Sequence, residues 1–240
     1  MTARKALARI AGALYLAVAI GGGFAEYARS SALVPGEAAA TATRMVERSA
    51  LLRLAFVSDL VAFPCFLGAG LVLYLLLRPV NPALALAMLV VNAVSLPIQA
   101  LNMLNHLAAL LVATSPAYTA GLSSQASQGL VLLLLDLHQQ GYLIAQIFFG
   151  LFLLPLGYLV YKSGYFPRAL GVILMIGCGG YLAQVAVSFA TAGSAPSFAL
   201  YFGLLGGLAE LVFLLWLLIM GAKVEEPGAA SVRAGLTWET

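Results

Sequence analysis

Four acids and two histidines stand in or at the edge of long apolar segments of this chain: Glu26, Asp59, His106, Asp136, His138 and Glu210. An ionised acid near the centre of a bilayer costs about 2.5–3.5 kcal/mol even on the lenient insertion scale, so such residues need partners or a function. Carboxylates and imidazoles can bind zinc, act as general bases or relay protons. Metal binding, hydrolysis and proton transfer are therefore the chemistries to weigh.

One apolar segment carries polar residues at steps of three and four positions, which places them in one stripe on a helix. The stripe consists of Asn92, Ser95, Gln99, Asn102 and His106. A stripe of this kind would be costly against lipid. We therefore expect it to face the bundle interior or a neighbouring helix.

Asp136 and His138 are only two residues apart, so their side chains project about 200° from each other on an ideal helix. The two side chains cannot chelate one ion without distortion. Asp136 shares a face with Gln139 and Gln140, whereas His138 shares one with Tyr142. We expect one face to point into a pocket and the other to hold a neighbouring helix.

The elements that must position these residues are apolar helices. Of 240 residues, 62% are hydrophobic and 9% charged, and the mean hydropathy is +1.01, which excludes an ordinary soluble domain. Continuous apolarity without period-two alternation predicts helices rather than a barrel. Six runs are long enough to cross a bilayer. They cover about residues 10–27, 51–77, 82–114, 130–161, 169–191 and 198–220.

We therefore predict one all-α domain over residues 1–222, a polytopic bundle of six transmembrane helices. Residues 223–240 are expected to form a polar, disordered cytoplasmic tail. The first run has the basic start of a secretory signal, but we expect it to remain as the first span. Small residues within the spans, such as Gly177 and the Gly203/Gly207 pair, predict close helix packing.

The distribution of basic residues predicts that both termini are cytoplasmic, because six crossings place eight of the twelve on one side. The protein is expected to be a multi-pass membrane protein. Residues 37–48 form an alanine-rich segment with both charge signs, predicted to be a helix on the outer surface. In this orientation the buried polar residues gather in the outer half of the bilayer.

One shared polar pocket or network is therefore expected. Its candidate residues are Glu26, Arg53, Asp59, Gln99, Asn102, Asn105, His106, Asp136, His138, Tyr142, Gln184 and Glu210. A divalent metal is one cofactor it could hold, through His138, Asp136, Asp59 and Glu210. There is no HExxH or other chelating pair, so no metal ligand is assigned.

The alternatives for function stay open at this point. The pocket could bind a small molecule, a lipid or an ion, or it could be a structural network in which Arg53 pairs with Glu26 or Asp59. An intramembrane hydrolase of lipid-like substrates and a proton-coupled transporter of small solutes are the other readings, although no enzyme motif such as GxSxG is present. The bilayer is one partner, and homo-oligomerisation stays open. The net charge of +3 without a dense basic run argues against nucleic acid.

The fourth apolar run and the turn after it carry a specific pattern. The pattern consists of Leu135-Asp136-Leu137-His138, Gly141-Tyr142, Phe148-Phe149-Gly150, Leu156-Gly157-Tyr158-Leu159 and Tyr161-Lys162-Ser163-Gly164-Tyr165-Phe166-Pro167-Arg168. In these residues the chain resembles the bacterial membrane family known as domain of unknown function 4386. The resemblance implies a six-helix membrane protein without an assigned activity, and it implies that Asp136 and His138 belong to the family's pattern. His106 does not match that pattern.

Overall fold

The computed structural model describes residues 3–191 and 196–223. Of the predicted tail at residues 223–240, all but Lys223 lies outside the described residues. The helices are α1 (Ala3–Ala32), α2 (Ala38–Glu47), α3 (Ser49–Leu77), α4 (Pro82–Thr114), η1 (Pro116–Tyr118), α5 (Ser124–Ser163), α6 (Arg168–Ala190) and α7 (Pro196–Ile219). No strand occurs in this described part of the chain.

Six of these helices, all except α2 and η1, are long and apolar enough to cross a membrane. Large apolar side chains such as Leu101 and Leu208, at 67% and 56% exposure, cover their outer faces. Such side chains are stable against lipid tails and unfavourable against water. The prediction of an all-helical membrane protein with six spans is therefore confirmed.

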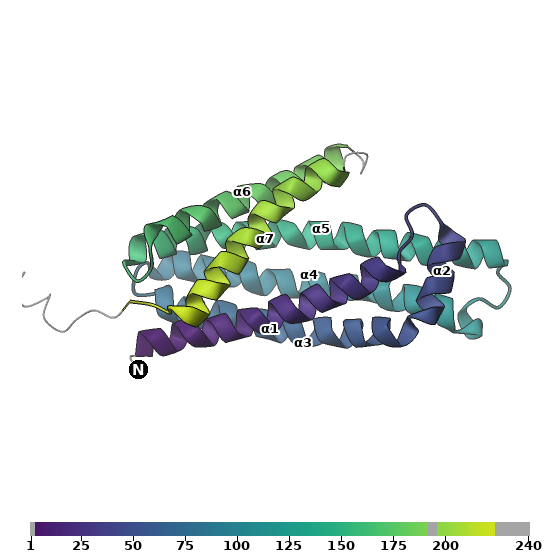
Figure 1. Cartoon of the computed structure of the whole chain (residues 1–240), viewed down its shortest axis with the longest axis horizontal. Coiled ribbons are helices and arrows are strands. Elements are labelled where there is room, and N and C mark those ends of the chain that lie inside the picture. Colours follow the sequence, from purple (N-terminus) through teal and green to yellow (C-terminus); the bar gives the residue numbers. More distant parts are fainter. Residues whose placement is uncertain (1–2, 192–195, 224–240) are drawn as a thin grey trace, which may run out of the picture.

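The six long helices run back and forth between two ends of the bundle (Figure 1). The N-terminus and the α3–α4 and α5–α6 turns lie at one end, which we call the N-terminal end. Asn81 begins α4 there because its side chain accepts a hydrogen bond from the Leu84 amide at 3.0 Å. Gly164, with φ of +68°, ends α5 in the left-handed conformation.

The opposite end, which we call the α2 end, is covered by the short helix α2 (Figure 1). Met45 of α2 is fully buried in a cluster with Leu110 of α4 and Val131 of α5. The turn before α2 is held by Thr41, whose hydroxyl accepts from the Val34 amide at 3.0 Å and donates to the Val34 carbonyl at 3.1 Å. The prediction of a helix within residues 37–48 is confirmed.

The main apolar core fills the N-terminal end of the bundle. Phe66 belongs to this core and makes edge-to-face contacts with Tyr15, Phe149 and Phe152, with ring centroids 5.7–6.0 Å apart. Such aromatic pairs add about 0.5–1.5 kcal/mol each beyond the area they bury. The core therefore separates the polar residues described below from the N-terminal end.

Helix α7 crosses α1 near the N-terminal end and then leans away from it, together with α6 (Figure 1). The crossing is close, because a Cβ atom added at Gly12 would lie 3.0 Å from side-chain atoms of Leu217 and Leu218. Glycines also bring α5 against α6 at Gly157 and Gly171, and α6 against α7 at Gly177 and Gly180. These contacts confirm the predicted close packing at the small residues. Helix α7 packs against α6 rather than against the half of α1 that is nearer the α2 end.

Candidate functional site

A cavity of about 900 Å³ lies where α7 leans away from α1. Residues of α1, α3, α4, α5, α6 and α7 line it. Its closed side is formed by Tyr15, Phe66 and Phe149 of the apolar core. Polar side chains gather in two groups on its wall, one around Arg29 and one around Glu210.

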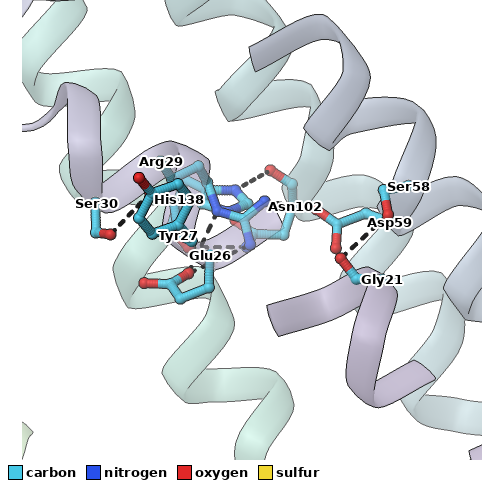
Figure 2. Close-up of polar contacts among 9 residues, drawn as sticks. All are labelled: Gly21, Glu26, Tyr27, Arg29, Ser30, Ser58, Asp59, Asn102 and His138. Carbon is cyan, nitrogen blue, oxygen red and sulfur yellow. Dashed lines mark hydrogen bonds and ion pairs between the residues drawn. The ribbon is translucent and has the colours of Figure 1, made fainter. Parts of the chain in front are cut away.

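The first group is an ion-pair cluster near the α2 end of α1 (Figure 2). The Arg29 guanidinium bonds to the Asp59 carboxylate of α3 at 2.5 Å and to Glu26, one turn earlier on α1, at 3.3 Å. The side chains of Arg29 and Asp59 are only 11% and 10% exposed, whereas that of Glu26 is 66% exposed. The Arg29–Asp59 pair is therefore the buried part of this cluster.

Two helix-to-helix hydrogen bonds hold α4 against α5 next to this cluster (Figure 2). The Asn102 amide donates to the His138 carbonyl at 2.8 Å, and the His138 Nδ1 lies 3.3 Å from the Asn102 carbonyl. Asn105 in turn donates to the Asn102 side chain at 3.1 Å. Asn102 reaches α5 because Gly141 has no side chain, and a Cβ atom there would collide with the asparagine.

His106 is fully buried behind this link and does not line the cavity. Its ring packs edge-on against Phe56 and His138, with centroid distances of 6.0 and 5.6 Å. Neither ring nitrogen has a hydrogen-bond partner within the described residues. In this structure His106 is thus a packing residue of the α3–α4–α5 contact.

The second polar group surrounds Glu210, at the middle of α7. The Tyr181 hydroxyl of α6 donates to the Glu210 carboxylate at 2.6 Å. Tyr142 of α5 lines the cavity together with Glu210 and with Glu26, Arg29 and Asp59 of the first group. The two groups therefore share one cavity.

Seven of the twelve predicted site residues line the cavity, and three lie immediately behind its wall. Those that line it are Glu26, Asp59, Gln99, His138, Tyr142, Gln184 and Glu210. Those behind it are Asn102, Asn105 and His106 of α4. The prediction that the α4 stripe faces inward is confirmed, because Asn92, Ser95, Asn102 and His106 are at most 8% exposed.

Arg53 and Asp136 are not brought to the cavity. Both are exposed, and neither lines it. The predicted pairing of Arg53 with Glu26 or Asp59 is wrong, because Arg29 holds both carboxylates. Arg53 precedes Asp59 by six residues, which turns its side chain about 240° away from the aspartate. Asp136 and His138 face different ways, as their spacing predicts.

The polar cavity residues that sequence reasoning missed include Tyr15, Arg29, Gln146 and Tyr181. Three of these four had a signal in the sequence. Arg29 follows Glu26 by three residues and Gln146 follows Tyr142 by four, so each shares a helix face with a predicted residue. Gln146 donates to Gln184, which joins α5 to α6 on the cavity wall. Tyr181 precedes Gln184 by three residues and so has the same signal, whereas Tyr15 has none.

The structure brings only three of the four candidate metal ligands to the cavity. Asp59, His138 and Glu210 line the cavity, whereas Asp136 lies outside it. Within residues 3–191 and 196–223, no three histidine, cysteine, aspartate or glutamate side chains are grouped so that they could hold a metal ion.

Comparison with known proteins gives a family match over most of the chain. The family described as "Domain of unknown function (DUF4386)" matches residues 10–221. An uncharacterized protein of Archaeoglobus fulgidus is 37% identical over 83 residues, which are 35% of this chain and 48% of that protein. The aligned part thus spans about half the length of this relative. No solved structure gives a significant match.

Proposed function

The chain belongs to the family "Domain of unknown function (DUF4386)", whose description assigns no activity, and from its cavity we propose that it binds a small amphipathic molecule within the membrane. The volume of about 900 Å³ is within the range of about 300–1,000 Å³ that is usual for small-molecule sites. The observation that carries the proposal is the mixed lining, in which two polar groups are set in apolar walls.

Access from the bilayer is supported by the side of the bundle on which α1 and α7 diverge. Gly23 on α1 and Leu200 and Leu211 on α7 line the cavity and are exposed, the two leucines by 56% and 45%. Exposed residues on these spans face lipid. An amphipathic molecule could therefore move laterally from the bilayer, keeping its apolar part in apolar surroundings.

The packing of the apolar core, between the cavity and the N-terminal end, supports binding rather than transport. A carrier needs a path to both sides of the membrane, and the path here would have to pass Tyr15, Phe66, Phe149 and Phe152. These rings pack against one another in the apolar core. Transport would require this core to open, whereas binding uses the cavity as it stands.

A cavity-filling substitution tests the proposal. Gly22 and Gly207 line the cavity on α1 and α7, and a Cβ atom at either meets at most the Tyr181 hydroxyl, 4.0 Å away. We expect Gly22→Leu and Gly207→Leu to weaken binding by at least about tenfold, or 1.4 kcal/mol. Because leucine is a better helix former than glycine by about 1 kcal/mol, the helices should persist.

The control is Gly179→Leu on α6, which also has open space around it but lies outside the cavity. The measurement is saturation binding of three fluorescent dodecyl probes, one cationic, one anionic and one uncharged, to the purified protein in nanodiscs. At least one probe should bind the wild type and the control equally. If no probe binds saturably, or if all four proteins bind alike, the cavity is not a binding site.

The orientation in the membrane is part of the proposal, and the basic residues support it. The N-terminal end carries seven of the described basic residues and the α2 end four, which by the positive-inside rule favours a cytoplasmic N-terminal end. The two sets are Arg4, Lys5, Arg9, Arg78, Lys162, Arg168 and Lys223, and Arg29, Arg44, Arg48 and Arg53. The protein would then be a multi-pass protein of a bacterial inner membrane, with its cavity in the outer half.

Single cysteines test this orientation in a background in which both native cysteines are alanine. Tyr118 lies in η1 at the α2 end and Pro79 in the turn between α3 and α4, and both are exposed. A membrane-impermeant maleimide should label Tyr118→Cys in intact cells and Pro79→Cys only after lysis. The reverse pattern would place the N-terminal end outside.

A further inference from the structure

We infer that the molecule bound in the cavity carries an organic ammonium group, and that Glu210, together with Tyr15, Tyr142 and Tyr181, binds this cation. This inference rests on the proposed function and adds the charge of the ligand and the place of its head group. It is carried by three observations, which concern the charge of the cavity, the tyrosine rings that line it together with Glu210, and an unpartnered tyrosine hydroxyl.

The cavity contains more acidic than basic groups. Among the described residues that line it, the acids are Glu26, Asp59 and Glu210, and Arg29 is the one arginine or lysine. Arg29 already bonds to both Asp59 and Glu26. Within residues 3–191 and 196–223, no cation pairs with Glu210, whose carboxylate accepts from the Tyr181 hydroxyl. An ionised carboxylate in such surroundings is strongly disfavoured without a counter-charge, which an ammonium group would supply.

Three tyrosines from three different helices line the cavity together with this carboxylate. They are Tyr15 of α1, Tyr142 of α5 and Tyr181 of α6, and the Tyr181 hydroxyl donates to Glu210 at 2.6 Å. The faces of aromatic rings attract cations, and rings grouped around an ammonium ion are a recurrent way to bind it. A carboxylate among tyrosines therefore suits an ammonium group better than a neutral or anionic one.

The hydroxyl of Tyr15 gives an independent indication of a ligand. Tyr15 is 5% exposed and lines the cavity, yet its hydroxyl has no hydrogen-bond partner within the described chain. A buried hydroxyl without a partner costs about 1–3 kcal/mol. A primary or secondary amine can donate to this oxygen and to Glu210, so a bound head group would satisfy both.

The space beside Glu210 also fits a head group with an apolar tail. Gly207 is one turn from Glu210 on α7, and a Cβ atom there would meet only the Tyr181 hydroxyl. Farther along the walls, Val18 of α1 and Leu211 of α7 offer apolar surface. An anionic head group has no comparable place, because the Arg29 guanidinium is flanked by carboxylates.

The test compares decylammonium with decanol, which has the same chain and no charge, for binding to the protein in nanodiscs after subtraction of empty nanodiscs. The wild type should prefer decylammonium by at least about tenfold. Glu210→Gln should abolish this preference, and saturable binding of decanol to this variant shows that the cavity is still formed. Asp136→Asn makes the same change of charge at an exposed site outside the cavity and should keep the preference.

The possible outcomes separate this inference from the proposed function. If binding is blocked by Gly22→Leu but does not depend on ligand charge or on Glu210, the cavity is a binding site and the ammonium inference is wrong. If an anionic probe is preferred, the inference is also wrong. If no probe binds, or Gly22→Leu has no effect on binding, the proposed function fails and the inference fails with it.

Discussion

Arg29→Leu is expected to lower the free energy of unfolding by about 3–5 kcal/mol, the usual cost of removing one partner of a buried ion pair. The reason is that the Asp59 carboxylate, which is 10% exposed, would lose the guanidinium that bonds to it. Glu26 contributes little to this effect because its side chain is 66% exposed, and exposed ion pairs are worth about 0–1 kcal/mol. The measurement is equilibrium unfolding of the purified protein in detergent.

Arg53→Leu is the matched control, because it removes an arginine of the same end of the bundle that is exposed and outside the cavity. It should change the stability by less than about 0.5 kcal/mol. The double variant Arg29→Leu/Asp59→Leu should recover most of the loss, since no buried charge is left unpaired. Equal losses in the two single variants, or a double variant as unstable as Arg29→Leu, would contradict the role of the buried pair.

Gly171→Leu should be the most disruptive substitution in the contact between α5 and α6. A Cβ atom at Gly171 would lie 2.5 Å from the Gly157 carbonyl oxygen and 2.6 Å from the Tyr161 amide nitrogen. Both are backbone atoms of α5, which cannot move aside as a side chain can. We expect a loss of at least about 3 kcal/mol, the upper end of what overpacking costs.

Gly179→Leu is again the suitable comparison, because it is on the same helix and has no atom within 4 Å of the added Cβ. Thermal unfolding followed by circular dichroism should show a large loss for Gly171→Leu and none for Gly179→Leu. If both variants unfold alike, α5 and α6 are not packed as closely as described.

The helices were predictable because their signals are local. The run at residues 82–114 matches α4 at both ends, since Asn81 caps the helix and Pro82 fits its first turn. The run at residues 130–161 is shorter than α5, which begins at Ser124 because Ser123 caps it by accepting from the Ala126 amide. A polar first turn of this kind adds no hydropathy, so hydropathy alone places the helix start too late.

The candidate site was predicted only in part, because it depends on how the helices are rotated and tilted against one another. Arg29 rather than Arg53 meets Asp59 because α1 packs against α3 where Ser58 donates to the Gly21 carbonyl at 3.1 Å (Figure 2). That contact is between residues 37 positions apart, and no local pattern reveals it. The place of Glu210 beside Tyr181 likewise follows from the lean of α7.

The uneven lengths of the helices have a consequence for the bilayer around the protein. With a rise of 1.5 Å per residue, Glu210 lies about 14 Å from the end of α7 at Ile219, close to the middle of a hydrocarbon layer of about 30 Å. Arg29 lies about 29 Å along α1 from Ile10, which would place it at the far boundary of that layer, and Asp136 about 39 Å along α5 from Lys162, which would place it among the head groups. In that position Asp136 would be exposed without a large cost.

The two polar groups of the cavity would then lie at different depths, one near the head groups and one near the midplane. On the other side of Glu210, the aromatic core of Tyr15, Phe66, Phe149 and Phe152 has no comparable polar group. The protein would thus expose polar side chains at the level of the lipid tails in one half of the bilayer only.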